Sequence, residues 1–220
     1  DEAVNPSSLI GRECYAGLDL STTLDLTAFV LIFPPRHDNE KYVILPFFWI
    51  PEDNLKQRVR RDHVPYDVWQ AQGHIKTTEG NVVDYRVIES DILEIASRYV
   101  VKEIAYDRYN ATQIILNLQD EGLTMIPFGQ GFKDMSPPTK EIYTLVLKRQ
   151  LIHNNHPVLR WNFDNVHVET DSAENIKPSK KYSTERIDGA VATVMALDRS
   201  IRNKKNSGSV YDKRGLIILG

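Results

Sequence analysis

Three apolar segments follow one another near the start of the chain, and only short polar stretches separate them. They cover residues 14–20, 26–33 and 41–50, and each is rich in the aliphatic, β-branched or aromatic residues typical of strands. Short connections join antiparallel neighbours, because a parallel pair needs a long crossover. The pattern therefore predicts an antiparallel meander of three strands, and it restricts the chain to a fold built on a sheet.

The remainder of the chain alternates between helical and extended patterns. Strands joined through helices pair in parallel. We therefore expect an α/β fold, in which a mixed sheet of five or more strands begins as an antiparallel meander, continues with parallel strands and is flanked by helices. Helices are predicted at about 85–99, 111–121, 136–152 and 184–202, the last capped by Ser183 or Thr184, and strands at about 103–107 and 124–128.

Length and composition agree with a single globular domain. The chain has 220 residues, 41% of them hydrophobic, and a net charge of −3, so it has no overall basic character that would indicate a nucleic-acid partner. No apolar run reaches the roughly 18–20 residues that cross a bilayer. We expect a linker at residues 1–12, a domain at 13–203 and a flexible tail at 204–220. Because the first residue is not Met, we also expect a fragment of a longer protein.

Three aspartates occupy positions where a lone carboxylate is unusual. Asp19 lies in the first apolar segment, Asp107 at the carboxyl end of a predicted strand, and Asp188 on the apolar stripe of the last predicted helix. Open sheets form their sites at the carboxyl ends of strands. Three carboxylates brought together there would repel one another unless divalent cations bound between them. Two such ions about 4 Å apart can promote in-line attack on a phosphodiester.

Each aspartate also has a structural interpretation. A strand-end aspartate is commonly a cap or turn residue, and Asp188 would interact favourably with the helix dipole near a helix start. The residues by themselves leave the metal site and these structural roles as alternatives. Other patterns indicate no chemistry: the six histidines lack the spacing of a helical zinc site, the glycines at 129 and 131 lack that of a phosphate loop, and Cys14 is expected in the core.

Four segments of the sequence together resemble a known family. They are "GLDLSTTLDLTAFVLIF", "IAYDRYNA", "PFGQGFKDMSPPTKEIYTLVLKRQLIHNNHPVLRW" and "KYSTERIDGAVATVMAL", in this order. In these segments the chain is similar to the nuclease half of the large terminase subunit of tailed bacteriophages. The resemblance implies a ribonuclease H-like fold and a metal-dependent endonuclease that cuts concatemeric double-stranded phage DNA at the start and end of capsid filling.

The resemblance also implies a role for each aspartate. Asp19, Asp107 and Asp188 would be the catalytic, metal-binding residues, with Asp19 bridging two Mg²⁺ or Mn²⁺ ions and the other two holding one ion each. Asp25 matches a further position of the family, where it would contact the metal site from outside the ligand set or simply cap a strand. Asp84 is a weaker candidate of the same kind.

A nuclease needs local basic residues to contact phosphates. The loop that leads into Asp188 supplies the best candidates, and one of its lysines could stabilise charge on the scissile phosphate. The alternatives are a solvated basic loop there and an exposed amphipathic segment at 56–61. The predicted DNA-binding residues are Lys177, Lys180, Lys181, Arg186 and Lys133.

The resemblance further implies partners and a location. In the family an ATPase motor domain precedes the nuclease in the same protein; this sequence contains no GxxxxGK[ST] phosphate loop, so the chain should cut DNA without translocating it. The portal and the small terminase subunit are the other expected partners, in the host bacterial cytoplasm and with no membrane. The alternatives are a docking module for DNA or the portal that does not cut, a resolvase-like nuclease of the same fold, and a ribonuclease acting on RNA–DNA hybrids.

Overall fold

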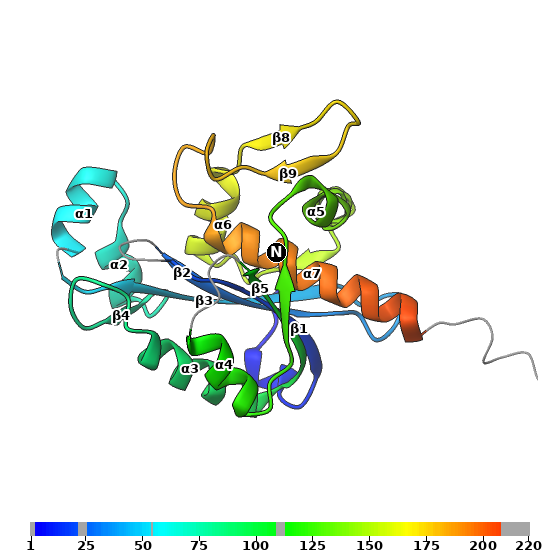
Figure 1. Ribbon diagram of the computed structural model, residues 1–220, viewed down its shortest axis with the longest axis horizontal. Coiled ribbons are helices and arrows are strands. Elements are labelled where there is room, and N and C mark those ends of the chain that lie inside the picture. Colours follow the sequence, from blue (N-terminus) through cyan, green and yellow to red (C-terminus); the bar gives the residue numbers. More distant parts are fainter. Residues whose placement is uncertain (1–2, 22–25, 54, 109–112, 208–220) are drawn as a thin grey trace, which may run out of the picture.

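A mixed sheet forms the centre of the computed structural model, which describes residues 3–21, 26–53, 55–108 and 113–207. Seven of the described strands form this sheet, in the order β4-β3-β2-β1-β5-β6, with β7 paired to β3 off that path. Helices cover both of its faces (Figure 1). The α/β fold and the mixed sheet that the sequence predicts are thus confirmed.

The meander forms the middle of the sheet. It consists of β1 (Glu13–Asp19), β2 (Thr27–Phe33) and β3 (Tyr42–Pro51). Both pairings are antiparallel, and every residue of β2 is buried. A strand covered on both faces reads as a continuous apolar run rather than an alternating one, which is why this segment is so clear in the sequence.

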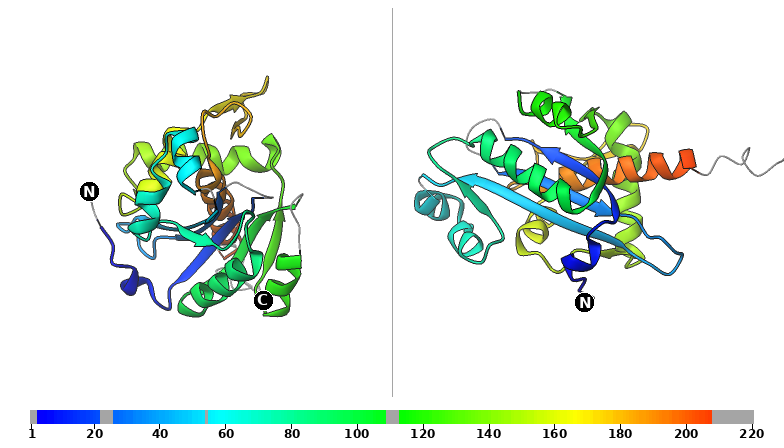
Figure 2. Two further views of the ribbon diagram at one scale, coloured as in Figure 1. Left: turned by 90° about the vertical axis from the view of Figure 1, so that its left-hand side faces the viewer. Right: turned by 90° about the horizontal axis from the view of Figure 1, so that it is seen from below.

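Parallel strands extend the sheet beyond β1. Strands β5 (Val100–Asp107) and β6 (Met125–Phe128) lie parallel to it, and α4 (Gln113–Asp120) lies between them in the chain. Leu18 of β1 pairs with Tyr106 of β5, so the carboxyl ends of these two strands coincide. Helix α3 (Tyr85–Arg98) precedes β5 and covers the same face as α4 (Figure 2).

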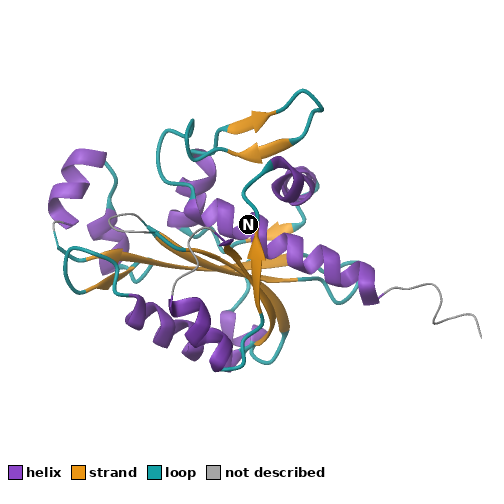
Figure 3. Cartoon of the chain, viewed as in Figure 1, coloured by secondary structure: helices purple, strands orange, loops and turns teal. Residues whose placement is uncertain are grey.

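Several short elements have no counterpart in the predicted order, although the sequence around Trp161 allows a helix and residues 166–169 allow an extended segment. They have too few residues to show a period of their own, and pairing with distant segments defines them. Strands β8 and β9 pair with each other outside the main sheet (Figure 3). These elements are α1 (Leu55–Asp62), α2 (Tyr66–Ala71), β4 (Lys76–Thr78), β7 (Leu151–Ile152), α6 (Pro157–Asp164), β8 (Val168–Thr170) and β9 (Ile176–Pro178).

The helix predicted at 136–152 is wrong at both ends. Helix α5 (Phe132–Leu147) starts after the extended residue Gly131, one turn before the Ser-Pro-Pro sequence, which predicts a start at residue 136. It ends early because Arg149 adopts a positive φ of 55°. That reversal turns the following residues into β7, which pairs with β3.

The last helix, α7 (Asp188–Ser207), starts four residues after the predicted Thr184. Neither Ser183 nor Thr184 caps it. The Ser183 hydroxyl instead donates to the Ser179 carbonyl and accepts from the His167 backbone N–H, which stabilises the turn before the helix. The helix continues past residue 203, the expected end of the domain.

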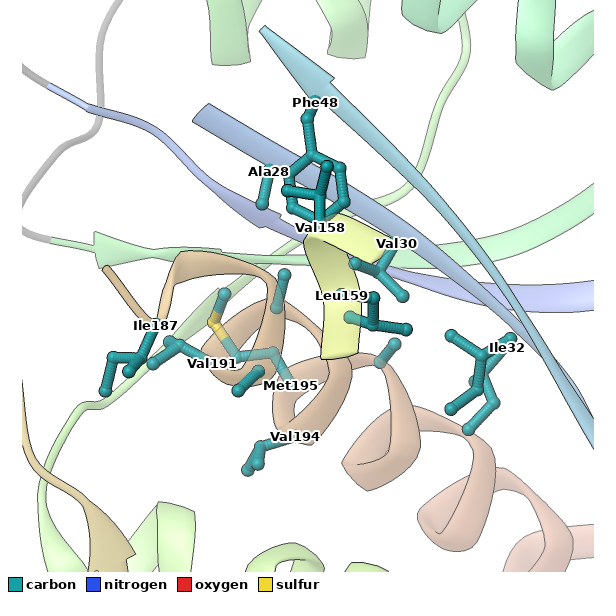
Figure 4. Packing of buried hydrophobic residues seen from close by; sticks show 14 of the residues in the cluster. Ala28, Val30, Ile32, Phe48, Val158, Leu159, Ile187, Val191, Val194 and Met195 are labelled. Carbon is teal, nitrogen blue, oxygen red and sulfur yellow. The ribbon is translucent and has the colours of Figure 1, made fainter. Parts of the chain in front are cut away.

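Two apolar cores lie on opposite faces of the sheet. One lies under α5, α6 and α7, where Val191 and Met195 of α7 pack near Val30 of β2 (Figure 4). The other lies under α3 and α4 and includes Cys14. Burial raises the pKa of the Cys14 thiol to about 12, so it is an unreactive core residue, as predicted.

The segment expected to be a linker is ordered against the sheet over part of its length. Residues Pro6–Leu9 form a short 3-10 helix, η1, and Leu9 is buried in the core beneath α3 and α4. Arg12 forms an ion pair with Glu40, 2.8 Å away. A single buried leucine among polar residues shows no periodicity, which is why the sequence indicated a linker. Among the described residues, no helix combines the length and apolar character needed to cross a membrane.

Candidate active site

Two buried carboxylates and one lysine meet at the carboxyl end of β1. Asp19 is the last residue of that strand and is 1% exposed; Asp188 is the first residue of α7 and is 6% exposed. The Lys180 Nζ lies 2.6 Å from the Asp19 Oδ2 and 2.8 Å from the Asp188 Oδ1. The structure therefore brings together two of the predicted catalytic residues with one of the predicted DNA-binding residues.

Close backbone contact between α7 and β1 sets the spacing of the two acids. A Cβ on Gly17 would lie 1.9 Å from the carbonyl oxygen of Ala192 in α7, so only glycine fits there. A Cβ on Gly189 would meet the Phe48 ring at 2.8 Å. Glycine at both positions lets the start of α7 approach the end of β1, and this brings Asp188 beside Asp19.

A buried asparagine fixes the first turn of α7. The Asn162 side chain of α6 accepts a hydrogen bond from the Gly189 backbone N–H at 2.6 Å and donates one to the Val158 carbonyl at 3.0 Å. Backbone N–H groups in the first turn of a helix have no partner within the helix, so Asn162 satisfies one of them. Sequence reasoning missed Asn162; a polar residue among the apolar positions of a short helix was its only signal.

Asp107 lies beside the pair. Because Leu18 pairs with Tyr106, the next residues, Asp19 and Asp107, end neighbouring strands. Asp107 is partly exposed, and its charge contributes to the raised pKa of Asp19. However, no three His, Cys, Asp or Glu side chains in the described part of the chain converge closely enough to hold a metal ion.

Asp19 has the most perturbed environment of the three acids. Burial raises its pKa to about 7 from the usual 3.8, and the charges of Asp188 and Asp107 act in the same direction. The Lys180 ammonium opposes this rise. Conversely, burial would lower the pKa of Lys180, but the two carboxylates outweigh it and raise that pKa. The charge of Lys180 thus depends on the two acids, and the charge of Asp19 depends on Lys180.

The oxygens of the acid pair suit a divalent cation. Among the described residues, the Oδ2 of Asp188 is buried without a hydrogen-bond partner, and the Oδ2 of Asp19 faces only the Lys180 ammonium in the ion pair at 2.6 Å. Buried polar atoms normally have a hydrogen-bond partner. Mg²⁺ and Mn²⁺ prefer oxygen ligands of this kind, and Mg²⁺ is typically held by one or two carboxylates together with water and phosphate oxygens. The residues present therefore fit such an ion.

The other predicted DNA-binding residues differ in their surroundings. Lys181 and Lys133 are exposed, and the Lys181 ammonium lies 5.0 Å from the centre of the Tyr182 ring. Lys177 is mostly covered, because it lies 3.7 Å from Glu169 and over the Phe132 ring.

Arg186 interacts electrostatically with helix α1. Arg186 is partly buried, and its charge helps to lower the pKa of Asp62 in α1, after the larger effect of the Arg61 hydrogen bond. Arg58 of the same helix is buried, which corrects the expectation of a wholly exposed amphipathic segment. Protein contacts thus constrain Lys177 and Arg186, whereas Lys181 and Lys133 are open to a phosphate.

Two further aspartates, Asp25 and Asp84, are predicted as weaker candidates at the metal site. Asp25 lies outside the described residues. Asp84 caps α3, where its carboxylate accepts from the Arg86 backbone N–H at 2.9 Å and pairs with the Arg86 side chain. That contact accounts for an aspartate at this position, and a role at the metal site stays a prediction.

Comparison with known proteins found similar domains. Residues 2–204 match the family model described as "Terminase large subunit, endonuclease domain". The terminase large subunit of Enterobacteria phage HK97 is 38% identical over 203 residues, which are 91% of this chain and 40% of that protein. The chain thus spans less than half the length of this curated relative.

Solved structures show the same fold. The crystal structure of the HK97 bacteriophage large terminase matches with a TM-score of 0.80 at 39% identity, over 87% of this chain and 40% of that one. The large terminase nuclease of the thermophilic phage G20c with bound magnesium matches with a TM-score of 0.56 at 12% identity, over 86% of this chain and 84% of that one. With the sheet order, these likenesses confirm the expected ribonuclease H-like fold.

Proposed function

This chain belongs to the family of terminase large subunit endonuclease domains, and from that premise we propose that it hydrolyses phosphodiester bonds of concatemeric double-stranded DNA during phage genome packaging. The observation that supports the site is the buried pair of Asp19 and Asp188 at the edge of the sheet where Asp107 also ends its strand. A buried acid pair that shares a single lysine is costly for folding alone, whereas it suits a cation-dependent reaction.

Asp19, Asp107 and Asp188 would hold two Mg²⁺ or Mn²⁺ ions, with Asp19 contributing to both. When bound, such a pair of ions supplies activation of a water for in-line attack on phosphorus and stabilisation of the leaving 3′ oxygen. The products would carry 5′-phosphate and 3′-hydroxyl ends. Asp25 remains a proposed contact outside the ligand set.

Lysine and arginine side chains near the acids would bind the phosphate backbone. Lys181 and Lys133 are open to solvent, and Lys180, Lys177 and Arg186 lie on the segment that leads into α7. Contacts of this kind position the duplex and carry no sequence information. We therefore expect cutting by the chain alone to show little sequence preference and to weaken as salt is raised.

The full packaging machine would provide the remaining functions. An ATPase motor domain of the same protein, the portal and the small terminase subunit are the proposed partners, in the cytoplasm of the bacterial host. The matched relative is more than twice as long as this chain, which leaves room for a motor domain outside the aligned part.

A plasmid-cutting assay tests the proposal. Supercoiled DNA is incubated with the chain in Mg²⁺, Mn²⁺ or EDTA, and nicked and linear products are counted for the native chain, Asp107→Ala, Asp188→Ala and the control Asp38→Ala. Asp38 is an exposed acid between β2 and β3. We expect metal-dependent cutting that both site variants lose and the control retains, with unchanged circular dichroism. Equal cutting by all four chains would contradict the proposed function. A native chain that never cuts, together with site substitutions that leave stability unchanged or raise it, would also contradict it.

A further inference from the structure

The positive charge that lies between Asp19 and Asp188 is the ammonium group of Lys180. Lys180 contacts an oxygen of each carboxylate, at 2.6 Å and 2.8 Å. We propose that Lys180 is an internal counter-ion that occupies the acid pair and competes directly with a divalent ion for it. This inference rests on the proposed function, because it concerns the same metal site.

The contact geometry makes the two occupants mutually exclusive. A divalent ion shared by Asp19 and Asp188 would need to lie about 2.0–2.2 Å from oxygens of both carboxylates. An ammonium in contact with the same two groups would then lie within a few ångströms of the ion, and like charges at that range repel strongly in a partly buried site. Ion binding therefore requires the Lys180 ammonium to withdraw.

The Lys180 side chain can move away from the site, whereas the two acids are held in place. Its side chain is 50% exposed, although its ammonium end lies against two buried carboxylates. It follows β9 in a turn rather than in a helix or strand, on a flexible four-carbon stem. Asp19 and Asp188, by contrast, belong to β1 and α7, which the Gly17 contact holds together. An approaching ion can thus displace the lysine without moving the carboxylates.

Two effects follow from this competition. In the absence of ions, Lys180 offsets the repulsion between the acids and so stabilises the fold. In the presence of ions, its displacement opposes binding, so the site has a lower affinity than its carboxylates alone would provide. Removal of the positive charge should therefore destabilise the ion-free protein and strengthen ion binding, a combination that a simple loss of structure would not produce.

The test compares Lys180→Met, which keeps an unbranched side chain but removes the charge, with Lys181→Met as the matched control. Mn²⁺ and Mg²⁺ affinities are measured by isothermal titration calorimetry, and melting temperatures are measured in EDTA. We expect Lys180→Met to bind Mn²⁺ at least about tenfold more tightly and to melt about 5 °C or more lower in EDTA. The control should match the native chain in both measurements.

Equal or weaker Mn²⁺ binding by Lys180→Met would overturn the competition while leaving the proposed function intact. Tighter binding in a chain that cuts no DNA would support the competition and contradict the proposed function. No ion binding by either chain would overturn both. If Lys180→Met fails to fold, ¹⁵N-detected NMR of the native chain gives the result: the Lys180 ammonium signal should change on Mg²⁺ addition, and an unchanged signal would overturn the proposal.

Discussion

Helix α7 buries one aspartate at its start and another in its middle, and the surroundings of the two differ. In the middle, both oxygens of Asp198 accept hydrogen bonds from Arg202, at 2.9 Å and 2.8 Å, and Arg199 lies 3.4 Å away. Arg199 in turn pairs with Glu103 at 2.7 Å. At the start, Asp188 and Asp19 share Lys180, and the Oδ2 of Asp188 has no hydrogen-bond partner among the described residues.

The comparison shows that burial of an acid does not by itself identify a site. Burial raises the pKa of Asp198 as it raises that of Asp19, so the direction of the shift does not distinguish the two sites. The ion pairs distinguish them. In the middle of the helix Asp198 and Glu103 pair with two arginines, whereas at its start two buried acids share one lysine that is half exposed. Among the ion pairs of the described residues, the site at the helix start thus has fewer bases than acids, and a divalent ion would add positive charge there.

The largest expected effect separates the two aspartates by function. Asp188→Asn should reduce metal-dependent cutting at least about 10³-fold, because a ligand charge is lost where the reaction takes place. Asp198→Asn should leave cutting within about threefold and lower the free energy of unfolding by only about 1 kcal/mol, since Arg202 loses its carboxylate partner but stays half exposed to water. Plasmid cutting and urea unfolding on both variants give the answer, and a loss of cutting in both would remove the distinction.

The next effect concerns the contact that brings the two acids together. Gly17→Ala places a Cβ against the Ala192 carbonyl, so we expect a loss of about 2–4 kcal/mol in unfolding free energy, or failure to fold. Gly131→Ala is the matched control, because no heavy atom lies within 4 Å of a Cβ built there. Thermal unfolding compares them. Equal stability of the two variants would show that α7 can shift away from β1 at little cost.

A smaller effect is expected at the asparagine that holds the first turn of α7. Asn162→Ala removes the acceptor of the Gly189 N–H and should cost about 1–3 kcal/mol of stability. Because Asp188 precedes Gly189, cutting by the folded fraction should also fall about tenfold. The control is Asn165→Ala at the far end of α6, where the side chain donates to the Trp161 carbonyl of the same helix. Cutting that stays normal in Asn162→Ala would make its role purely structural.

The smallest effect is a loss of stability in acid. The ring of His156 caps α6 by accepting from the Leu159 N–H, and burial lowers its pKa to about 4 from 6.5, with the charges of His74 and His153 acting in the same direction. Between these values the unfolded chain binds a proton that the folded chain does not, so stability falls as pH drops through 6.5 and levels off near 4. We expect a total loss of about 1–3 kcal/mol.

Subtraction isolates that contribution from those of other titrating groups. Urea unfolding of the native chain and of His156→Gln is measured from pH 7.5 to pH 4, and the difference between the two curves is taken. This difference in unfolding free energy should become smaller as the pH falls, because His156 titrates in the native chain and glutamine does not titrate in the variant. A difference that stays constant would show that His156 is protonated equally in the folded and unfolded chain.

Local patterns and the family resemblance predicted much of this molecule. The meander was clear because β2 is apolar throughout, and β5 ended, as predicted, at Asp107. Asp19 and Asp188 stood out because each interrupts an apolar pattern with a charge. The predictions failed where distant residues decide the structure: β7 exists because it pairs with β3, and the start of α7 depends on Ser183 bonding to Ser179 and His167.

The sequence by itself determined that this chain forms a mixed sheet, and that charged groups are buried at particular positions in its strands and helices. Side-chain periodicity and the cost of burying a charge are local properties, and both can be read along a chain. The tertiary structure alone decided which charges meet. Lys180 reaches two acids that belong to separate elements, and Asn162 secures the helix start beside them. Both contacts follow from the close packing of α7 on β1 at Gly17, a contact between residues 175 positions apart in the chain.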